Sequence, residues 1–155
     1  MTVAAETQPK ASPLMTSILA GVITAIPAIA FTLLVQADQM VLYILAWLLI
    51  GTGPVLGYGL ATGQLGKEWL PLIGGIIGSI PIVSLLWPVL VGAMSRNYGI
   101  GRLYLGSILG LILGFAAFFL AATFMGQGQD PIWLATGFVL LCAVWGGSCG
   151  AFMSR

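Results

Sequence analysis

Charged residues divide the chain into long apolar segments. The uncharged stretches are 11–37, 39–66, 69–95, 103–129 and 131–154. A helix that crosses a hydrocarbon core of about 30 Å needs roughly 20 residues, so each stretch is long enough for one crossing. The apolar runs lack the alternation of barrel strands, and backbone in lipid must satisfy its own hydrogen bonds. The pattern therefore predicts an all-α, polytopic integral membrane helical bundle.

Short polar segments mark where the predicted transmembrane helices end. Gly, Gln and charged residues gather at 63–69 and at 126–131, as expected for turns between helices. Residues 1–13 are expected to form a short polar N-terminal tail, and residues 14–155 a single transmembrane domain. The five predicted helices are 14–35, 40–62, 70–94, 103–125 and 132–152.

The composition excludes a soluble domain. Charged residues make up 6% of the chain and hydrophobic residues 59%, whereas an ordinary soluble domain has about 25% charged residues. Five basic and four acidic side chains cannot cover the surface of a soluble protein of this length. Membrane lipid is therefore an expected partner, and nucleic acid is not.

The basic residues also predict an orientation. Five crossings place Lys10 and Lys67 on one face of the membrane and Arg96, Arg102 and Arg155 on the other. Because cytoplasmic loops carry more Lys and Arg, the sequence favours an N-terminus outside and a C-terminus inside. An inner or plasma membrane, or an energy-transducing membrane of the thylakoid type, is the expected location.

A cleaved signal peptide is an alternative interpretation of the first predicted helix. Val35 and Ala37 are small residues at the spacing that a signal peptidase requires. However, the apolar run that begins at Leu14 is longer than a typical signal core, and Lys10 is the one basic residue before it. We therefore expect the first helix to be retained.

Glycine spacing predicts where the helices pack. Glycine accounts for 22 of the 155 residues, and many glycines recur four residues apart, which places them on one helix face. Such faces let helix backbones approach closely in a membrane. The neighbour is a helix of the same chain, a second copy or another subunit. The predicted packing glycines are Gly53, Gly57, Gly74, Gly78, Gly106, Gly110, Gly114, Gly146 and Gly150.

Four prolines lie inside the predicted helices and are expected to bend them. Pro27 is in the first helix, Pro54 in the second, and Pro81 and Pro88 in the third. Each proline removes an intrahelical hydrogen bond. Such kinks serve packing, although broken helices also build transporter sites near the membrane midplane. The first and last helix pairs would moreover have inverted topology, as in many transporters.

The side chains required for most catalytic chemistry are missing. The sequence has no histidine, which excludes histidine-ligated haem or zinc and a histidine general base. No Asp, Glu, Lys or Arg falls inside a predicted helix, whereas proton relays depend on such residues. Cys142 and Cys149 are about two helical turns apart, too far for a disulfide. We expect no enzyme activity, no cofactor and no metal site.

Arg96 and Arg102 form one candidate contact site. They lie in the segment 95–102, which has two basic residues and no acidic residue. Guanidinium groups suit a lipid phosphate or an acidic partner. The alternative is an ordinary cytoplasmic loop whose charges set the topology.

Two functions stay open from the sequence. The preferred hypothesis is a non-enzymatic, helix-packing subunit of a larger membrane complex or a homo-oligomer, because packing faces are abundant and catalytic side chains are missing. The alternative is a small channel or transporter for a neutral or weakly charged solute or ion. The predicted kinks and the inverted helix pairs favour this alternative.

Overall fold

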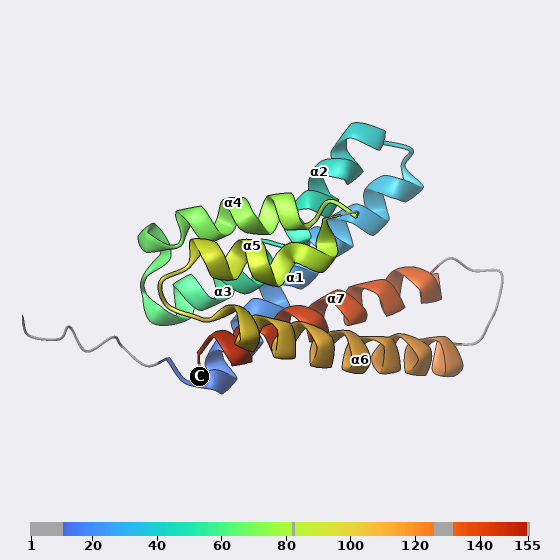
Figure 1. Ribbon diagram of the computed structural model, residues 1–155. Helices are drawn as coiled ribbons and strands as arrows, with labels where there is room; N and C mark the ends of the chain where they lie inside the picture. Colours follow the sequence, from blue (N-terminus) through green and yellow to red (C-terminus); the bar gives the residue numbers. More distant parts are fainter. Residues whose placement is uncertain (1–10, 82, 126–131, 155) are drawn as a thin grey trace, which may run out of the picture.

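The computed structural model describes residues 11–81, 83–125 and 132–154, and within them the chain is helical without strands. The three long helices are α1 (Pro13–Gln36), α6 (Ile100–Met125) and α7 (Ile132–Met153) (Figure 1). The shorter helices are α2 (Met40–Ile50), α3 (Gly53–Thr62), α4 (Trp69–Gly78) and α5 (Trp87–Met94). Two 3-10 turns, η1 (Leu65–Lys67) and η2 (Ser84–Leu86), precede α4 and α5.

Three of the predicted helices are confirmed as candidate membrane spans. α1, α6 and α7 match the predictions at 14–35, 103–125 and 132–152, and each is long and apolar enough to cross a membrane. Large hydrophobic side chains on them, such as Leu33 and Ile112, are exposed on the outside of the bundle. Because such a surface is unfavourable in water, these helices associate with a membrane.

The second predicted helix is interrupted. α2 ends at Ile50, α3 begins at Gly53, and the two helices are bent by 49° at this break. Pro54 has no amide hydrogen, so a continuous helix would leave the carbonyl of Ile50 without a donor. Pro54 instead stands in the first turn of α3, where no donor is needed. Pro27, by contrast, lies within α1, which continues through it.

The third predicted helix, at 70–94, is wrong as a single helix. The chain turns back after α4, and α5 returns beside it, with Gly78 against Trp87. Pro81 lies in the turn and Pro88 in the first turn of α5, so each proline stands where a helix is interrupted or begins. The described residues contain three candidate spans, or four if α2 and α3 count as one bent span. The predicted number of five is not confirmed.

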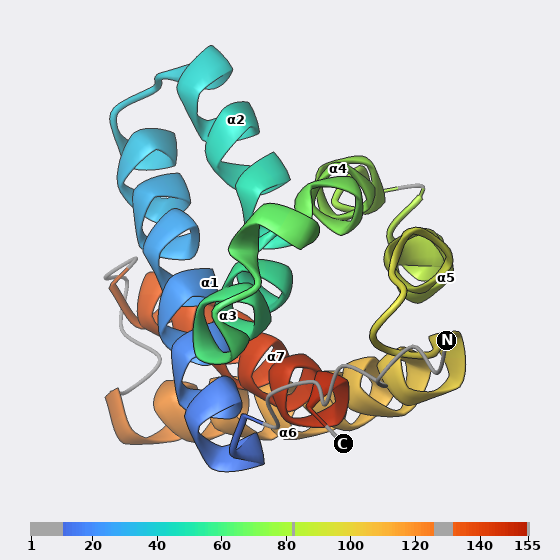
Figure 2. The same cartoon turned by 90° about the vertical axis from the view of Figure 1, so that its left-hand side faces the viewer.

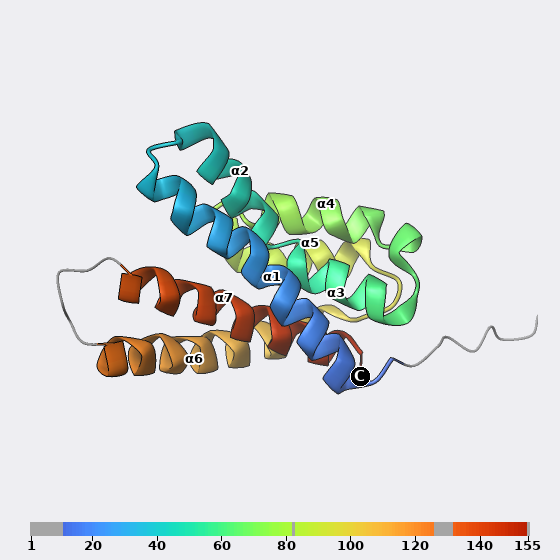
Figure 3. The same ribbon diagram turned by 180° about the vertical axis from the view of Figure 1, so that it is seen from behind.

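α7 lies at the centre of the helix packing. The start of α1 lies beside the end of α7, where Gly150 approaches Thr16. The start of α6 lies beside the same end, where Gly106 approaches Cys149. Both long helices are therefore antiparallel to α7, and α3 contacts α1 and α7 (Figures 2 and 3).

The start of α1 and the end of α7 lie at the same end of the bundle. This end, which we call the proximal end, holds the start of α1, the segments 63–68 and 95–99, and Ser154; the distal end holds the turn 37–39 (Figures 1 and 3). The α4–α5 hairpin enters and leaves at the proximal end. The expectation of an outside N-terminus and an inside C-terminus required residues 70–94 to cross the membrane once. The α4–α5 hairpin instead returns to the end where it began, so that expectation does not fit the fold.

Candidate functional site

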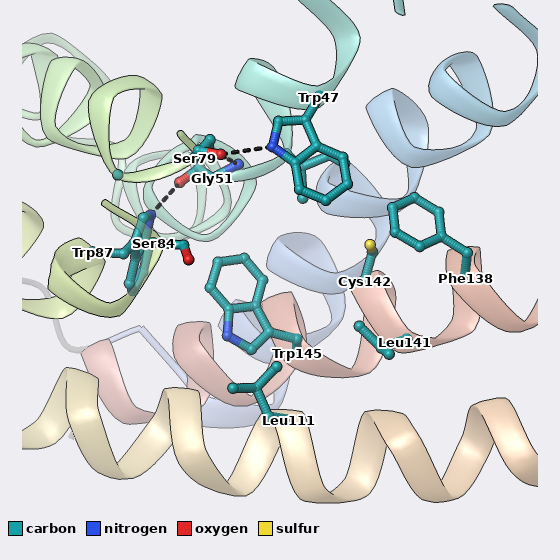
Figure 4. A pocket seen from close by; sticks show the side chains of 12 residues that line it. Trp47, Gly51, Ser79, Ser84, Trp87, Leu111, Phe138, Leu141, Cys142 and Trp145 are labelled. Carbon is teal, nitrogen blue, oxygen red and sulfur yellow. Dashed lines mark hydrogen bonds between the residues drawn. The ribbon is translucent and has the colours of Figure 1, made fainter. Parts of the chain in front are cut away.

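The tip of the α4–α5 hairpin meets the α2–α3 break. The Ser79 hydroxyl donates to the Gly75 carbonyl and accepts from the Gly51 amide, both at 2.9 Å. The Trp87 indole N–H donates to the Gly51 carbonyl at 3.0 Å. The Trp47 indole N–H donates to the Ser79 carbonyl at 2.6 Å (Figure 4). The backbone groups of Gly51, at the α2–α3 break, thus bind side chains of the hairpin, and the Ser79 carbonyl, at the end of α4, binds a side chain of α2.

A cavity of about 160 Å³ lies at this junction. The break and the hairpin tip line one side, and the middle of α6 and of α7 lines the other (Figure 4). No Asp, Glu, Lys or Arg is among its lining residues. A charged solute would therefore lose its hydration here without meeting an opposite charge. The aromatic and hydroxyl side chains of the lining are Trp47, Trp87, Phe138, Trp145, Ser79 and Ser84.

Aromatic contacts fix the walls of the cavity. Trp87 of α5 meets Trp145 of α7 edge-on, with ring centroids 5.0 Å apart. Trp47 of α2 stacks on Phe138 of α7 at 5.9 Å. The Trp145 indole N–H donates to the Ser107 hydroxyl at 3.0 Å. Aromatic pairs contribute about 0.5–1.5 kcal/mol beyond their buried area, so these rings hold α2, α5 and α7 around one space.

A buried carboxylate holds the base of the α4–α5 hairpin. Glu68, which directly precedes α4, is 1% exposed. Its carboxylate accepts hydrogen bonds from Asn97 Nδ2 at 2.7 Å and from the Tyr98 hydroxyl at 2.9 Å, both in the loop after α5. Tyr98 also packs edge-on against Tyr58 of α3 at 5.1 Å. Glu68 therefore joins the two ends of the hairpin to each other and to the broken span.

The Tyr98 hydroxyl is held in its neutral form. Burial, and then the neighbouring Glu68 carboxylate, raise the pKa of Tyr98 above its ordinary value. A neutral phenol donates a hydrogen bond, whereas a phenolate would repel the carboxylate. Tyr98 therefore stays a donor to Glu68 at and well above neutral pH.

Replacing Glu68 with leucine should lower the free energy of unfolding by about 2–3 kcal/mol, because the buried Tyr98 hydroxyl loses its carboxylate acceptor. Glu68→Gln keeps one acceptor oxygen and should cost about 1 kcal/mol. Denaturant titration in mixed micelles, followed by tryptophan fluorescence, measures the change. Lys67→Leu at the exposed neighbouring position is the control, with a change of at most about 0.5 kcal/mol. Equal stability of Glu68→Leu and the unchanged protein would contradict this role.

The nine predicted packing glycines are buried at contacts between helices of this chain. A Cβ added at Gly110, for example, would lie 2.9 Å from the Cα of Trp145. The sequence left open whether these glycines pack on helices of the same chain, on a second copy or on another subunit. The contacts described are with helices of the same chain. Gly53 and Gly57 on α3, and Gly146 and Gly150 on α7, face α1. Gly74 and Gly78 on α4 face α5. Gly106, Gly110 and Gly114 on α6 face α7.

The other residues singled out by the sequence lie in different places. Arg96 and Arg102 are exposed at the proximal end, away from the junction. Cys142 lines the cavity, whereas Cys149 is fully buried elsewhere on α7, and both thiols are free. Within the described ranges, no three Cys, Asp or Glu side chains lie close enough to hold a metal ion together.

Sequence reasoning missed the junction and the buried carboxylate. Trp47, Ser79 and Trp87 fall inside predicted helices, where they resemble ordinary packing residues. The available signal is a proline within three residues of a glycine, at 51–54 and at 78–81, because such runs favour a helix break. Glu68 has no local signal, since its burial depends on how two loops fold against α3.

The fold and the junction define a helical, membrane-associated protein with three candidate spans, a bent α2–α3 pair and an α4–α5 hairpin that turns back beside it. The chain matches no family model, and comparison with curated proteins and with solved structures gives no significant match. Its function is therefore inferred from the geometry of the junction.

Proposed function

We propose that this protein is a small channel or carrier for an uncharged solute. The observation that supports the proposal is the meeting of the α2–α3 break and the α4–α5 tip beside a half-open cavity between the helices. Non-helical backbone at membrane depth is tolerated where it is buried in protein or lines a cavity. Discontinuous helices near the midplane build the substrate sites of many transporters. Packing alone does not require two interruptions at one point.

The charge distribution favours an uncharged solute over an ion. The cavity has no charged lining residue, and the described basic residues Lys67, Arg96 and Arg102 lie at the proximal end. Transfer of an unpaired ion into such a space costs several kcal/mol. Because no carboxylate, lysine or histidine lines the cavity, general acid–base catalysis is not part of the proposal.

Proteoliposomes test the proposal. The reconstituted protein should raise vesicle permeability to a small uncharged solute such as urea or glycerol severalfold, measured by stopped-flow light scattering after an osmotic step. Leu111→Trp, which adds bulk at a cavity-lining position, should remove most of this permeability. Leu113→Trp adds the same bulk on the same helix at a position that does not line the cavity, and it should leave the permeability unchanged. Vesicles no more permeable than protein-free ones to any such solute would refute the proposal.

A second candidate is a subunit of a membrane complex or a homo-oligomer. An outer groove of about 520 Å³, lined by apolar side chains that include Phe31, Tyr43 and Pro81, favours this candidate. A helix of another subunit or copy would bury this surface, whereas the glycine faces are already used within the chain. Native mass spectrometry of the same preparation distinguishes the two candidates, because a stable monomer counts against a subunit.

We further propose that both ends of the chain face the cytoplasm. Lys67, Arg96 and Arg102 lie at the proximal end, and Lys10 and Arg155 adjoin that end in the sequence. The turn at the distal end contains an aspartate and no basic residue. Cytoplasmic loops carry the excess of Lys and Arg, so the proximal end is assigned to the cytoplasm. An inner, plasma or thylakoid-type membrane stays the predicted location.

A further inference from the structure

We infer that the backbone carbonyls of Gly51 and Ser79 bind the transported solute, and that the indoles of Trp47 and Trp87 occupy these carbonyls when the path is closed. The solute is a small uncharged molecule that donates hydrogen bonds. This inference rests on the proposed channel or carrier function and assigns its substrate class and its closing groups.

Both carbonyls lie at the end of an interrupted helix. Gly51 follows the last residue of α2, and Ser79 follows the last residue of α4. Carbonyls at a helix end lose the amide donor that the next turn would supply. Here indole N–H groups serve as donors, and each comes from another element: Trp47 of α2 caps the end of α4, and Trp87 of α5 caps the end of α2. Each helix end therefore receives its hydrogen-bond donor from the element that carries, or adjoins, the other helix end.

The acceptor character of the site determines what can replace the indoles. A carbonyl oxygen accepts hydrogen bonds, so a competing solute must donate them. An anion finds no donor at these oxygens, and a cation finds no carboxylate in the lining. The cavity volume of about 160 Å³ has room for a molecule of a few heavy atoms. A polyol or an amide of a few heavy atoms meets both conditions.

Trp47 is the side chain with room to move. It lines the inner cavity on one side and the outer groove of about 520 Å³ on the other. Trp87, by contrast, is 2% exposed and packs against Trp145. Rotation of the Trp47 ring into the outer groove would break its contacts with Phe31 and Phe138 and release the Ser79 carbonyl. We therefore expect Trp47 to open the path and Trp87 to respond after it.

Single Trp→Phe substitutions test this assignment in proteoliposomes. Trp47→Phe and Trp87→Phe keep an aromatic ring but remove the N–H, which frees one carbonyl each. Trp133→Phe is the matched control, because it also removes an indole N–H but lies outside the cavity lining. Urea or glycerol permeability should rise severalfold in the first two variants and stay unchanged in the control. An equal change, or no change, in all three variants would overturn the inference.

A binding measurement separates this inference from the transport proposal. In ¹⁵N-labelled protein in micelles, urea should shift the indole N–H signals of Trp47 and Trp87 saturably, whereas Trp69 and Trp133 outside the cavity should follow bulk solvent. Such shifts without flux in any protein would support the site and refute transport. Flux without these shifts, and without an effect of the Trp47 and Trp87 variants, would support the transport proposal and refute the proposed solute site. If Trp87→Phe fails to fold, Trp47→Phe and the shifts decide.

Discussion

Replacing Gly57 with alanine should separate α3 from α1 and remove most of the folded protein. A Cβ at this position would overlap the backbone N and Cα of Ala20. Backbone atoms cannot turn aside as the end of a long side chain can, so the two helices must move apart. Overpacking of a tight contact costs about 1–3 kcal/mol or more, and we expect a loss at the upper end of that range. Folded yield by size-exclusion chromatography and denaturant titration in micelles measure the loss.

Gly101→Ala is the matched control for this substitution. Gly101 also lies within a helix, α6, but nothing lies within 4 Å of a Cβ added there. Alanine is favoured over glycine in a helix by about 0.5–1 kcal/mol, so this variant should be at least as stable as the unchanged protein. Gly110→Leu, on the same helix but against α7, should behave like Gly57→Ala. A fully folded Gly57→Ala protein would contradict the close packing of α3 on α1.

The long helices were predictable because hydropathy is a local property of the chain. α1, α6 and α7 are uninterrupted apolar runs between polar turns, and their limits follow from that pattern. The same pattern measures how long a segment stays apolar, and not how often it crosses the membrane. The run 69–95 has the length of a span, yet α4 ends at Gly78, the chain turns back near Pro81, and α5 begins at Trp87. The hairpin was therefore outside what the pattern could predict.

The candidate site depends on contacts between residues far apart in the sequence. The Trp47–Ser79 hydrogen bond spans 32 residues, and the Trp87–Gly51 bond spans 36. No spacing rule connects such pairs, since each side chain taken alone is compatible with ordinary packing. Glu68 illustrates the same limit, because its sequence neighbours Lys67 and Trp69 are exposed while it is buried. The prolines predicted distorted helices. That the α2–α3 break meets the end of α4 depends on the tertiary fold, which the local sequence does not indicate.

Reporter proteins fused to the two ends of the chain should both be found in the cytoplasm. With α1, the α2–α3 span, α6 and α7 as crossings, the number of crossings is even, and the ends share one side. The side is assigned by the basic residues of the proximal end. A fluorescent protein that folds in the cytoplasm should fluoresce at either end, and alkaline phosphatase, which is active outside it, should be inactive there. Phosphatase inserted after Asp38, at the distal turn, should be active.

The hairpin tip provides an independent measurement of the same topology. Leu85 is 81% exposed at the tip. In the proposed topology the tip ends within the bilayer, so a cysteine there should resist membrane-impermeant thiol reagents from both sides. A cysteine at exposed Leu65, in the proximal segment, should react from the cytoplasmic side and serve as the control. Labelling of Leu85→Cys from the outside, with end reporters in opposite compartments, would mean that α4 and α5 together cross the membrane. Gly51 and Ser79 would then not meet at mid-depth, and the proposed solute site would lose its basis.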